Sequence, residues 1–144
     1  MIALLQRVSK ASVTVDGDCI GRIDQGILAL IGVQPNDDDA LLRLFLSRIL
    51  NYRIFADAEG KMNSSLVDIE GALLLVPQFT LAANTRKGRR PSFTSAATPK
   101  HGKVIFQAMV DAARSIYATV ECGQFGADMQ VELINDGPVT FILD

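Results

Sequence analysis

The chain has few of the side chains on which most hydrolases and transferases depend. Its one histidine, His101, lies where a helix should begin, so we expect a capping or surface residue and not a base. No serine lies in a Gly-x-Ser-x-Gly elbow, and no glycine-rich phosphate loop follows a predicted strand. Paired carboxylates occur only in turns and helix starts. Dehydrogenase, kinase, metallohydrolase and serine-triad functions are therefore excluded.

Cysteines and long apolar runs are also scarce. Cys19 and Cys122 lie far apart, with no metal-ligand partner near either, so we expect two reduced thiols, no disulfide and no metal site. No apolar run approaches the ~18 residues of a membrane span, and residues 1–7 lack the features of a signal peptide. These absences predict a cytoplasmic protein without a membrane partner.

Apolar residues are plentiful enough to build a core. Of the 144 residues, 49% are hydrophobic, and a chain of this length buries roughly 68–70% of its unfolded surface. We expect one domain that spans residues 1–144. The mean hydropathy of +0.24 favours a surface that is buried in an oligomer.

The spacing of apolar residues predicts an α/β fold. Two segments have the helical period and an N-cap, residues 38–51 and a second segment from Thr98 to about Thr119. Residues 62–70 are expected to form a loop or a short helical turn. Strands are expected at residues 2–15, 19–23, 27–33, 52–55, 72–76, 129–133 and 139–143, with a turn at 136–138. The predicted architecture is a single domain with a mixed, mostly antiparallel, barrel-like curled sheet and two main helices packed on it.

The stretch 71–81 organises the rest of the chain. Its apolar run, 72–76, predicts a fully buried strand. Pro77 cannot donate a ladder hydrogen bond, so sheet pairing should end or bulge there. The residues left at the rim of the sheet are Gln78, Phe79 and Thr80. Their backbone N–H groups, carboxamide and hydroxyl are suited to hold a polar ligand.

Thr80 is a candidate nucleophile with an ordinary structural explanation, because threonine is a favoured strand residue. A threonine nucleophile needs a base, and the sequence places none beside it. We therefore expect no covalent mechanism. The backbone N–H groups of Phe79 and Thr80 are better suited to form an oxyanion hole for an ester carbonyl, where one donor contributes about 2.7–4 kcal/mol.

Four of the fourteen basic side chains fall within five residues around Gly88, just before Pro91. Glycine and proline at these places predict a loop and not a helix face. The four are Arg86, Lys87, Arg89 and Arg90. Two interpretations are equally consistent with the sequence. The loop is simply solvated, or it contacts nucleic-acid phosphates and its binding is favoured by counterion release.

Two segments, PQFTL at 77–81 and NDGPVT at 135–140, resemble the signatures of the D-aminoacyl-tRNA deacylases. The segments LQRVSKASVTVDG, NYRIFADAEGKMN, TRKGRRPSF and FGADMQVELINDGPVT are similar to the same family in the same order, so the resemblance covers essentially the whole chain. It implies an enzyme that hydrolyses the ester of a tRNA charged with a D-amino acid or glycine. The substrate's 2′-hydroxyl assists, and neither a cofactor nor DNA is implied.

The resemblance also implies further site residues. Gly137-Pro138 would be a cis peptide that reaches into the partner's site in a homodimer and crowds the position of an L side chain. Arg7 would support the site. Phe125 and Met129 would be walls of the adenosine or aminoacyl pocket, although both are equally explained as core residues.

The chain departs from the family pattern at two places. Pro77 stands where the family usually has serine, and Ala82-Ala83-Asn84 replaces Tyr-Ala-Asp. The missing base, the altered Pro77 and the basic cluster keep a second hypothesis open, a non-enzymatic RNA-binding homodimer.

Overall fold

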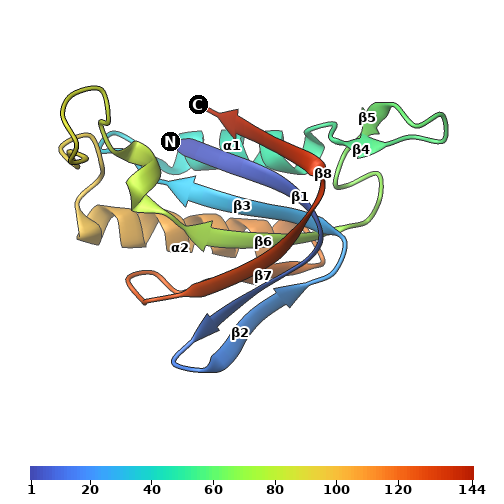
Figure 1. Ribbon diagram of the computed structural model, residues 1–144, viewed down its shortest axis with the longest axis horizontal. Coiled ribbons are helices and arrows are strands. Elements are labelled where there is room, and N and C mark those ends of the chain that lie inside the picture. The colour runs from blue at the N-terminus through green and yellow to red at the C-terminus, as the bar shows by residue number, and fades with distance from the viewer.

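The computed structural model describes residues 1–144 as one curled sheet with two helices on one face and a small hairpin beside it (Figure 1). The strands are β1 (Ile2–Val15), β2 (Asp18–Ile23), β3 (Gly26–Gly32), β4 (Phe55–Ala56), β5 (Met62–Ser64), β6 (Ala72–Pro77), β7 (Val120–Cys122) and β8 (Gln130–Leu143). The helices are α1 (Asp39–Asn51), the 3-10 helix η1 (Phe79–Ala82) and α2 (Pro99–Ile116). The predicted fold class is confirmed.

The long strand β1 joins the two parts of the sheet. One of its edges pairs antiparallel with β3 near its start and with β2 near its end, while β8 pairs antiparallel along the other edge. The sheet continues from β3 through parallel pairing to β6 and then β7. Because β8 pairs with β1 alone, its outer edge is unpaired in the single chain.

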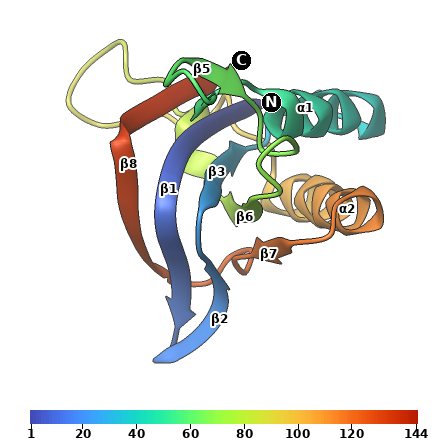
Figure 2. The same cartoon turned by 90° about the vertical axis from the view of Figure 1, so that its right-hand side faces the viewer.

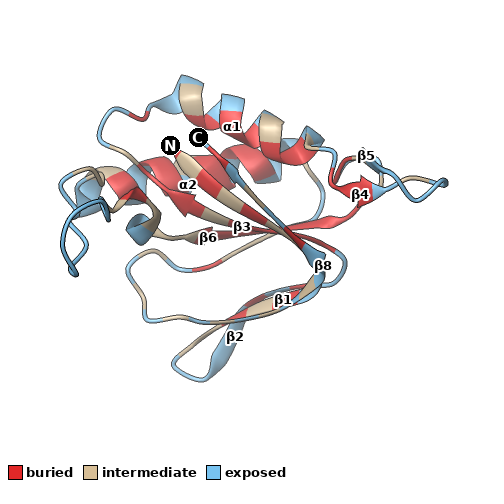
Figure 3. Ribbon diagram, turned by 45° about the horizontal axis from the view of Figure 1, so that its top comes forward, coloured by how far each residue is buried: buried red, intermediate tan, exposed pale blue.

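The apolar residues form two clusters, one on each face of the curled sheet. The larger cluster lies between the sheet and both helices and contains alternating residues of β1 and β3, such as Leu5 and Ile31. The smaller cluster lies inside the curl, where Val8, Leu28 and Val76 pack together. Figure 2 shows both helices on one side of the sheet, and Figure 3 shows that their buried faces turn toward it.

Both helices begin at the residues that the sequence indicates. Asp38 accepts a hydrogen bond from the N–H of Leu41, and Thr98 accepts one from the N–H of His101, which satisfies an otherwise free donor at each helix start. Pro99 occupies the first turn of α2, where its missing N–H has no cost. The predicted start of each helix is confirmed, and α2 ends at Ile116, before the predicted Thr119.

The C-terminal strand differs most from the prediction. Two strands separated by a turn at 136–138 were expected, but one strand, β8, runs through all of this region. The physical reason is the length of β1, which pairs with both halves of β8. The pairing register shifts between Gln6 and Val8 and again between Val8 and Lys10, so Asp136, Gly137 and Pro138 bulge out of the ladder and the strand continues.

Smaller differences occur in the hairpin that follows α1. A strand was predicted at 52–55 and a loop or helical turn at 62–70, whereas the structure pairs Phe55–Ala56 with Met62–Ser64. The hairpin depends on polar contacts that the apolar pattern does not reveal: Asp57 accepts hydrogen bonds from two turn N–H groups and from the Asn63 carboxamide. None of the three helices combines the length and apolar composition that a membrane crossing needs.

Candidate active site

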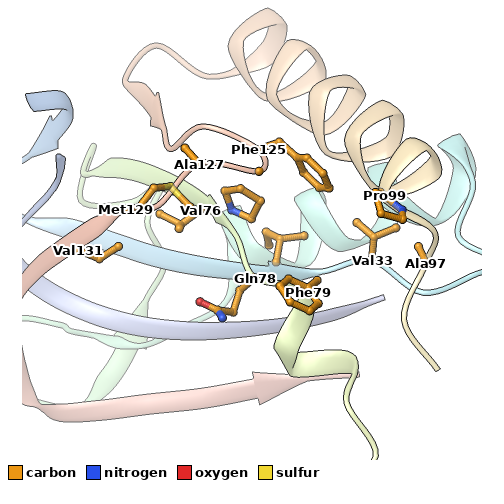
Figure 4. Close-up of a pocket in the computed structure, with 14 residues that line it drawn as sticks. Val33, Val76, Gln78, Phe79, Ala97, Pro99, Phe125, Ala127, Met129 and Val131 are labelled. Carbon is orange, nitrogen blue, oxygen red and sulfur yellow. The ribbon is translucent and has the colours of Figure 1, made fainter. Parts of the chain in front are cut away.

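A cavity of about 460 Å³ lies where β6 ends. The ends of β3 and β6, the starts of η1 and α2, and the segment before β8 surround it. The lining residues are Ile31, Val33, Val76, Pro77, Gln78, Phe79, Ala97, Pro99, Gly102, Phe125, Gly126, Ala127, Met129 and Val131. None of these has an ionisable side chain, and Gln78 supplies the one polar side chain. Figure 4 shows Phe125 and Met129 on one side of the cavity, with Gln78 and Phe79 on the other.

The rim of the cavity forms because sheet pairing ends at Pro77, as predicted. Pro77 is the last residue of β6 and pairs with Ile31, whose carbonyl then accepts a hydrogen bond from the Gln78 N–H at 2.8 Å. The chain turns at once into η1, whose first internal hydrogen bond runs from the Leu81 N–H to the Gln78 carbonyl at 3.2 Å.

The N–H groups of Phe79 and Thr80 precede that first bond. The opening N–H groups of a helix have no partner within the helix, and Gln78 makes no side-chain cap to them. The Gln78 carboxamide donates instead to the Thr80 hydroxyl. The donors that the sequence predicted at a strand end thus lie at the start of a 3-10 helix.

The walls of the cavity are held by aromatic and sulfur contacts. The Phe125 ring lies 6.5 Å from the ring of Phe106, measured between centroids, and covers Gly102. A Cβ at Gly102 would come within 3.2 Å of Phe125, so glycine allows this ring to close against α2. Met129 lies over Gly123 and accepts a hydrogen bond from the Gln124 N–H through its sulfur. Phe125 and Met129 both line the cavity.

The start of α2 is the wall that sequence reasoning missed. Ala97, Pro99 and Gly102 line the cavity, but the helical pattern marked this region only as an N-cap and a first turn. A glycine in the second turn of a helix, where it is unfavourable by about 1 kcal/mol relative to alanine, was the available signal for a close approach.

Ionisable groups with shifted pKa values lie outside the cavity. Hydrogen bonds from Ser65 lower the pKa of Asp68, and burial raises the pKa of Tyr117, whose hydroxyl donates to the carbonyls of Leu66 and Gly71. His101 is also absent from the lining, since its ring bonds to the Asp37 carbonyl at 2.9 Å. No three His, Cys, Asp or Glu side chains gather in a way that could hold a metal ion.

Arg7, Gly137 and Pro138 lie apart from this cavity within one chain. Ile2 of β1 pairs with Gly32 beside the cavity, whereas Arg7 pairs with Ile27. Five residues of strand separate these positions, which corresponds to about 16 Å. The structure therefore does not bring these three predicted site residues to the cavity of their own chain.

The bulge that contains Gly137 is held by side chains on either side. Arg7 donates to the carbonyl of Asp136 at 2.8 Å and to that of Ile54 at 2.7 Å. Asn135 accepts a hydrogen bond from the Val139 N–H at 2.6 Å, and its own N–H₂ group contacts the Val139 carbonyl and the Thr140 hydroxyl. Asn135 lies in the NDGPVT segment, but sequence reasoning did not identify it as a support.

The peptide bond between Gly137 and Pro138 is cis. Gly137 has a φ of +153°, a conformation that L residues rarely adopt, and an added Cβ would come 2.6 Å from the Val139 side chain. Asp136, Gly137 and Pro138 are all exposed. This bulge of Asp136, Gly137 and Pro138, called the Gly137-Pro138 turn below, thus presents its backbone to the solvent.

The four predicted basic side chains lie on an exposed loop beside the cavity. Two backbone hydrogen bonds between Asn84 and Ser92, at 2.8 and 3.0 Å, close the loop at its base. Next to this base, Phe93 contacts Phe79 with ring centroids 5.1 Å apart. Arg86, Lys87, Arg89 and Arg90 are all exposed, and none takes part in an ion pair.

Comparison with known proteins agrees with the resemblance. The sequence model of the family described as D-Tyr-tRNA(Tyr) deacylase matches residues 4–144. The chain belongs to this family. It is 58% identical over 144 residues to proteins named D-aminoacyl-tRNA deacylase from Ectopseudomonas mendocina (strain ymp) and Pseudomonas aeruginosa (strain LESB58), and the alignments cover 100% of this chain and 99% of each relative. The predicted family and the prediction of a hydrolase are confirmed.

Two solved structures have the same fold as this deacylase-family chain. A protein described as c-Myc DNA Unwinding Element Binding Protein matches with a TM-score of 0.95 and 38% identity, covering 100% of this chain and 98% of that one. A probable eukaryotic D-amino acid tRNA deacylase matches with a TM-score of 0.84 and 18% identity, covering 99% and 97%. At that lower identity the second match shows the fold alone.

Proposed function

We propose that this protein hydrolyses the ester that joins a D-amino acid, or glycine, to the terminal adenosine of a tRNA. The observation that carries the proposal is a cavity without ionisable side chains that is lined by Phe79, the first residue of η1. Thr80 does not line the cavity, but its N–H and that of Phe79 are the two free donors at the start of this helix. Such a site can stabilise developing charge but cannot supply a base or a nucleophile. The names of the 58% identical relatives support the substrate class.

The reaction is a direct hydrolysis. The oxygen of a water molecule bonds to the ester carbonyl carbon, the bond from that carbon to the ribose oxygen breaks, and the ribose oxygen receives a proton. The N–H groups of Phe79 and Thr80 donate to the carbonyl oxygen as it becomes negative. The substrate's 2′-hydroxyl takes the assisting role for which the cavity has no side chain.

The selectivity element is assigned to a second copy of the chain. In a homodimer, Gly137 and Pro138 of one subunit reach the cavity of the other. Two observations support this arrangement: Arg7, which contacts the turn, lies about 16 Å along β1 from the end of the strand beside the cavity, and the outer edge of β8 is unpaired. Ile142, on the same strand, is 62% exposed, as expected for a face that a partner covers. Light scattering should give twice the 15.6 kDa chain mass.

Exclusion of the wrong enantiomer explains why glycine would be accepted. The rigid Gly137-Pro138 backbone crowds the position of an L side chain, and a clash discriminates without recognising any particular D side chain. Glycine has no side chain to clash. The same element therefore predicts a broad range of D substrates and activity on glycyl-tRNA, including glycine mischarged on tRNA(Ala).

The basic loop is assigned to the tRNA backbone. Its four cations are exposed and unpaired, and the contact between Phe79 and Phe93 fixes its base beside the cavity. Replacing Arg86, Lys87, Arg89 and Arg90 together by alanine should weaken tRNA binding and reduce its dependence on salt.

Deacylation of one tRNA charged in parallel with a D-amino acid, its L enantiomer and glycine tests the function. Rapid loss of the D and glycyl esters, with the L ester spared, is the expected result. Binding of tRNA with every ester left intact would favour the second candidate, a non-enzymatic RNA-binding homodimer, which the basic loop and Pro77 support. Because charged tRNA is the substrate, we place the activity in the cytoplasm.

A further inference from the structure

Charge is distributed very unevenly along this chain. Residues 71–110 contain six of the fourteen Lys and Arg residues and none of the sixteen Asp and Glu residues. The same segment supplies β6, η1, the basic loop and the first two thirds of α2. The net charge of −2 therefore conceals a cationic region around the cavity.

Two of these six cations lie outside the basic loop, on α2. Lys100 and Lys103 each follow a cavity-lining residue, Pro99 and Gly102, by one position. Successive residues are rotated by about 100° around a helix, so both lysines lie on the face of α2 next to the one that lines the cavity. They are three positions apart and therefore neighbours on that face. Both are exposed, and neither takes part in an ion pair.

The exposed face of α2 stays cationic only beside the cavity. Further along the helix, Asp111 is the first acidic residue, and it accepts a hydrogen bond from Gln107 on the same face. Lys100 and Lys103 thus have no anionic neighbour on α2. The basic loop and the first turns of α2 lie at the same end of the molecule (Figure 1). The cavity is lined by Pro99 on α2 and by Phe79, whose ring contacts Phe93 next to the base of the loop.

We infer that Lys100 and Lys103 form a second phosphate-binding surface, across the cavity from the basic loop, that holds the tRNA chain as it leaves the site. The inference rests on the proposed function, because it places the end of a tRNA in the cavity. A nucleic-acid backbone is the partner that suits this surface, since its regularly spaced charges can engage exposed lysines on both sides of the cavity mouth.

The test measures, by fluorescence anisotropy, how the binding of tRNA that carries no amino acid depends on salt concentration. The variant Lys100→Gln/Lys103→Gln removes two charges beside the cavity. The matched control, Lys10→Gln/Arg22→Gln, removes two exposed charges that form no ion pair from β1 and β2, and neither side chain lines the cavity. Both variants change the net charge equally, and poly-glutamate serves as a competing polyanion without the spacing of a nucleic acid.

The α2 variant should make the negative slope of log K against log salt less steep, by about 0.7 to 0.9 per lysine, and should weaken tRNA binding by roughly five- to eightfold per lysine at 0.1 M salt. The control variant should leave the slope unchanged. Equal salt slopes for the α2 variant and the control variant would overturn the inference. So would an α2 variant that loses poly-glutamate binding as strongly as it loses tRNA binding. The binding assay uses tRNA that carries no amino acid, so it does not depend on hydrolysis. If the protein left the D ester intact in the deacylation assay, the proposed function would be refuted, but the binding result would still hold.

Discussion

The cavity at the end of β6 and the Gly137-Pro138 turn of β8 are built in different ways. The cavity is lined by residues that core packing fixes, such as Ile31 and Val76, which are each 1% exposed. The turn is exposed, and polar contacts from Arg7 and Asn135 hold it. One region is complete within a single chain, whereas the other turns its fixed backbone outward.

In the proposed mechanism, this difference separates the rate of hydrolysis from the selectivity for the D ester. A cavity with N–H donors at a helix start accelerates hydrolysis of any ester that enters it, because the donors stabilise the oxyanion whatever the side chain. A rigid turn that excludes one enantiomer adds nothing to the rate for the other. Changes to the cavity should therefore slow hydrolysis of every ester, and changes to the turn should alter the ratio of D to L hydrolysis.

The largest effect is expected from loss of an N–H donor at the rim. Phe79→Pro removes the backbone N–H at the first position of η1, a position that proline tolerates. We expect kcat for the D ester to fall by about 10²–10³. Phe79→Ala is the matched control, since it removes the ring and keeps the N–H. Similar rates for the two variants would show that the N–H of Phe79 is not a catalytic donor.

A smaller effect is expected from Gly137→Ala. The φ of +153° and the 2.6 Å approach to Val139 make a side chain costly here, of order 1–3 kcal/mol, so the turn should shift. The ratio of D to L hydrolysis should fall by about tenfold or more, while the rate for the D ester changes little. Gly60→Ala is the control, because Gly60 also has a positive φ, of +77°, but lies in the β4–β5 hairpin with open space around it. An unchanged ratio in Gly137→Ala would separate the turn from selectivity.

Asn135→Ala should lower the ratio of D to L hydrolysis less than Gly137→Ala does. The variant removes hydrogen bonds that join the two sides of the turn, each with a net value of about 0.5–1.5 kcal/mol, so we expect a roughly two- to tenfold lower ratio. Asn63→Ala, which removes a carboxamide bonded to Asp57 in the hairpin, should lose stability and keep the ratio. Equal ratios in the two variants would leave Asn135 with a structural role alone.

The smallest effect concerns the turn that leads into β6. Hydrogen bonds from Ser65 lower the pKa of Asp68, so this carboxylate stabilises the fold at pH values above its ordinary pKa. That contribution is lost as the pH falls through the lowered pKa of the folded state. Urea unfolding of the wild type and Asp68→Asn should therefore show a stability difference at pH 7 that narrows below about pH 4. A difference that is constant with pH would contradict the assignment.

Local signals in the sequence predicted the strand end at the cavity and the helix starts. The run 72–76, Pro77 and the caps at Asp38 and Thr98 act over a few residues, and the structure confirms each of them. Gly102 was missed because its role depends on Phe125, a residue from a different part of the chain. A close approach between distant elements leaves little trace in a local pattern.

The region around the turn was predicted less well for the same reason. Asp136-Gly137-Pro138 has the composition of a chain reversal, and the apolar pattern on either side fits two short strands. One continuous strand forms because β1 offers partners to both halves of β8, a condition set by residues more than a hundred positions away. Likewise, nothing local shows that Arg7 bonds to the carbonyl of Asp136.

A mixed dimer tests most directly whether the turn acts on the cavity of the partner. One subunit carries Phe79→Pro, with an inactive cavity and an intact turn, and the other carries Gly137→Ala, with an active cavity and an altered turn. The two are purified together through different tags. We expect this dimer to hydrolyse the D ester and spare the L ester, because the active cavity faces the intact turn of the partner. Hydrolysis of the L ester at the Gly137→Ala homodimer's rate per active cavity, which is half the homodimer rate per dimer, would contradict it.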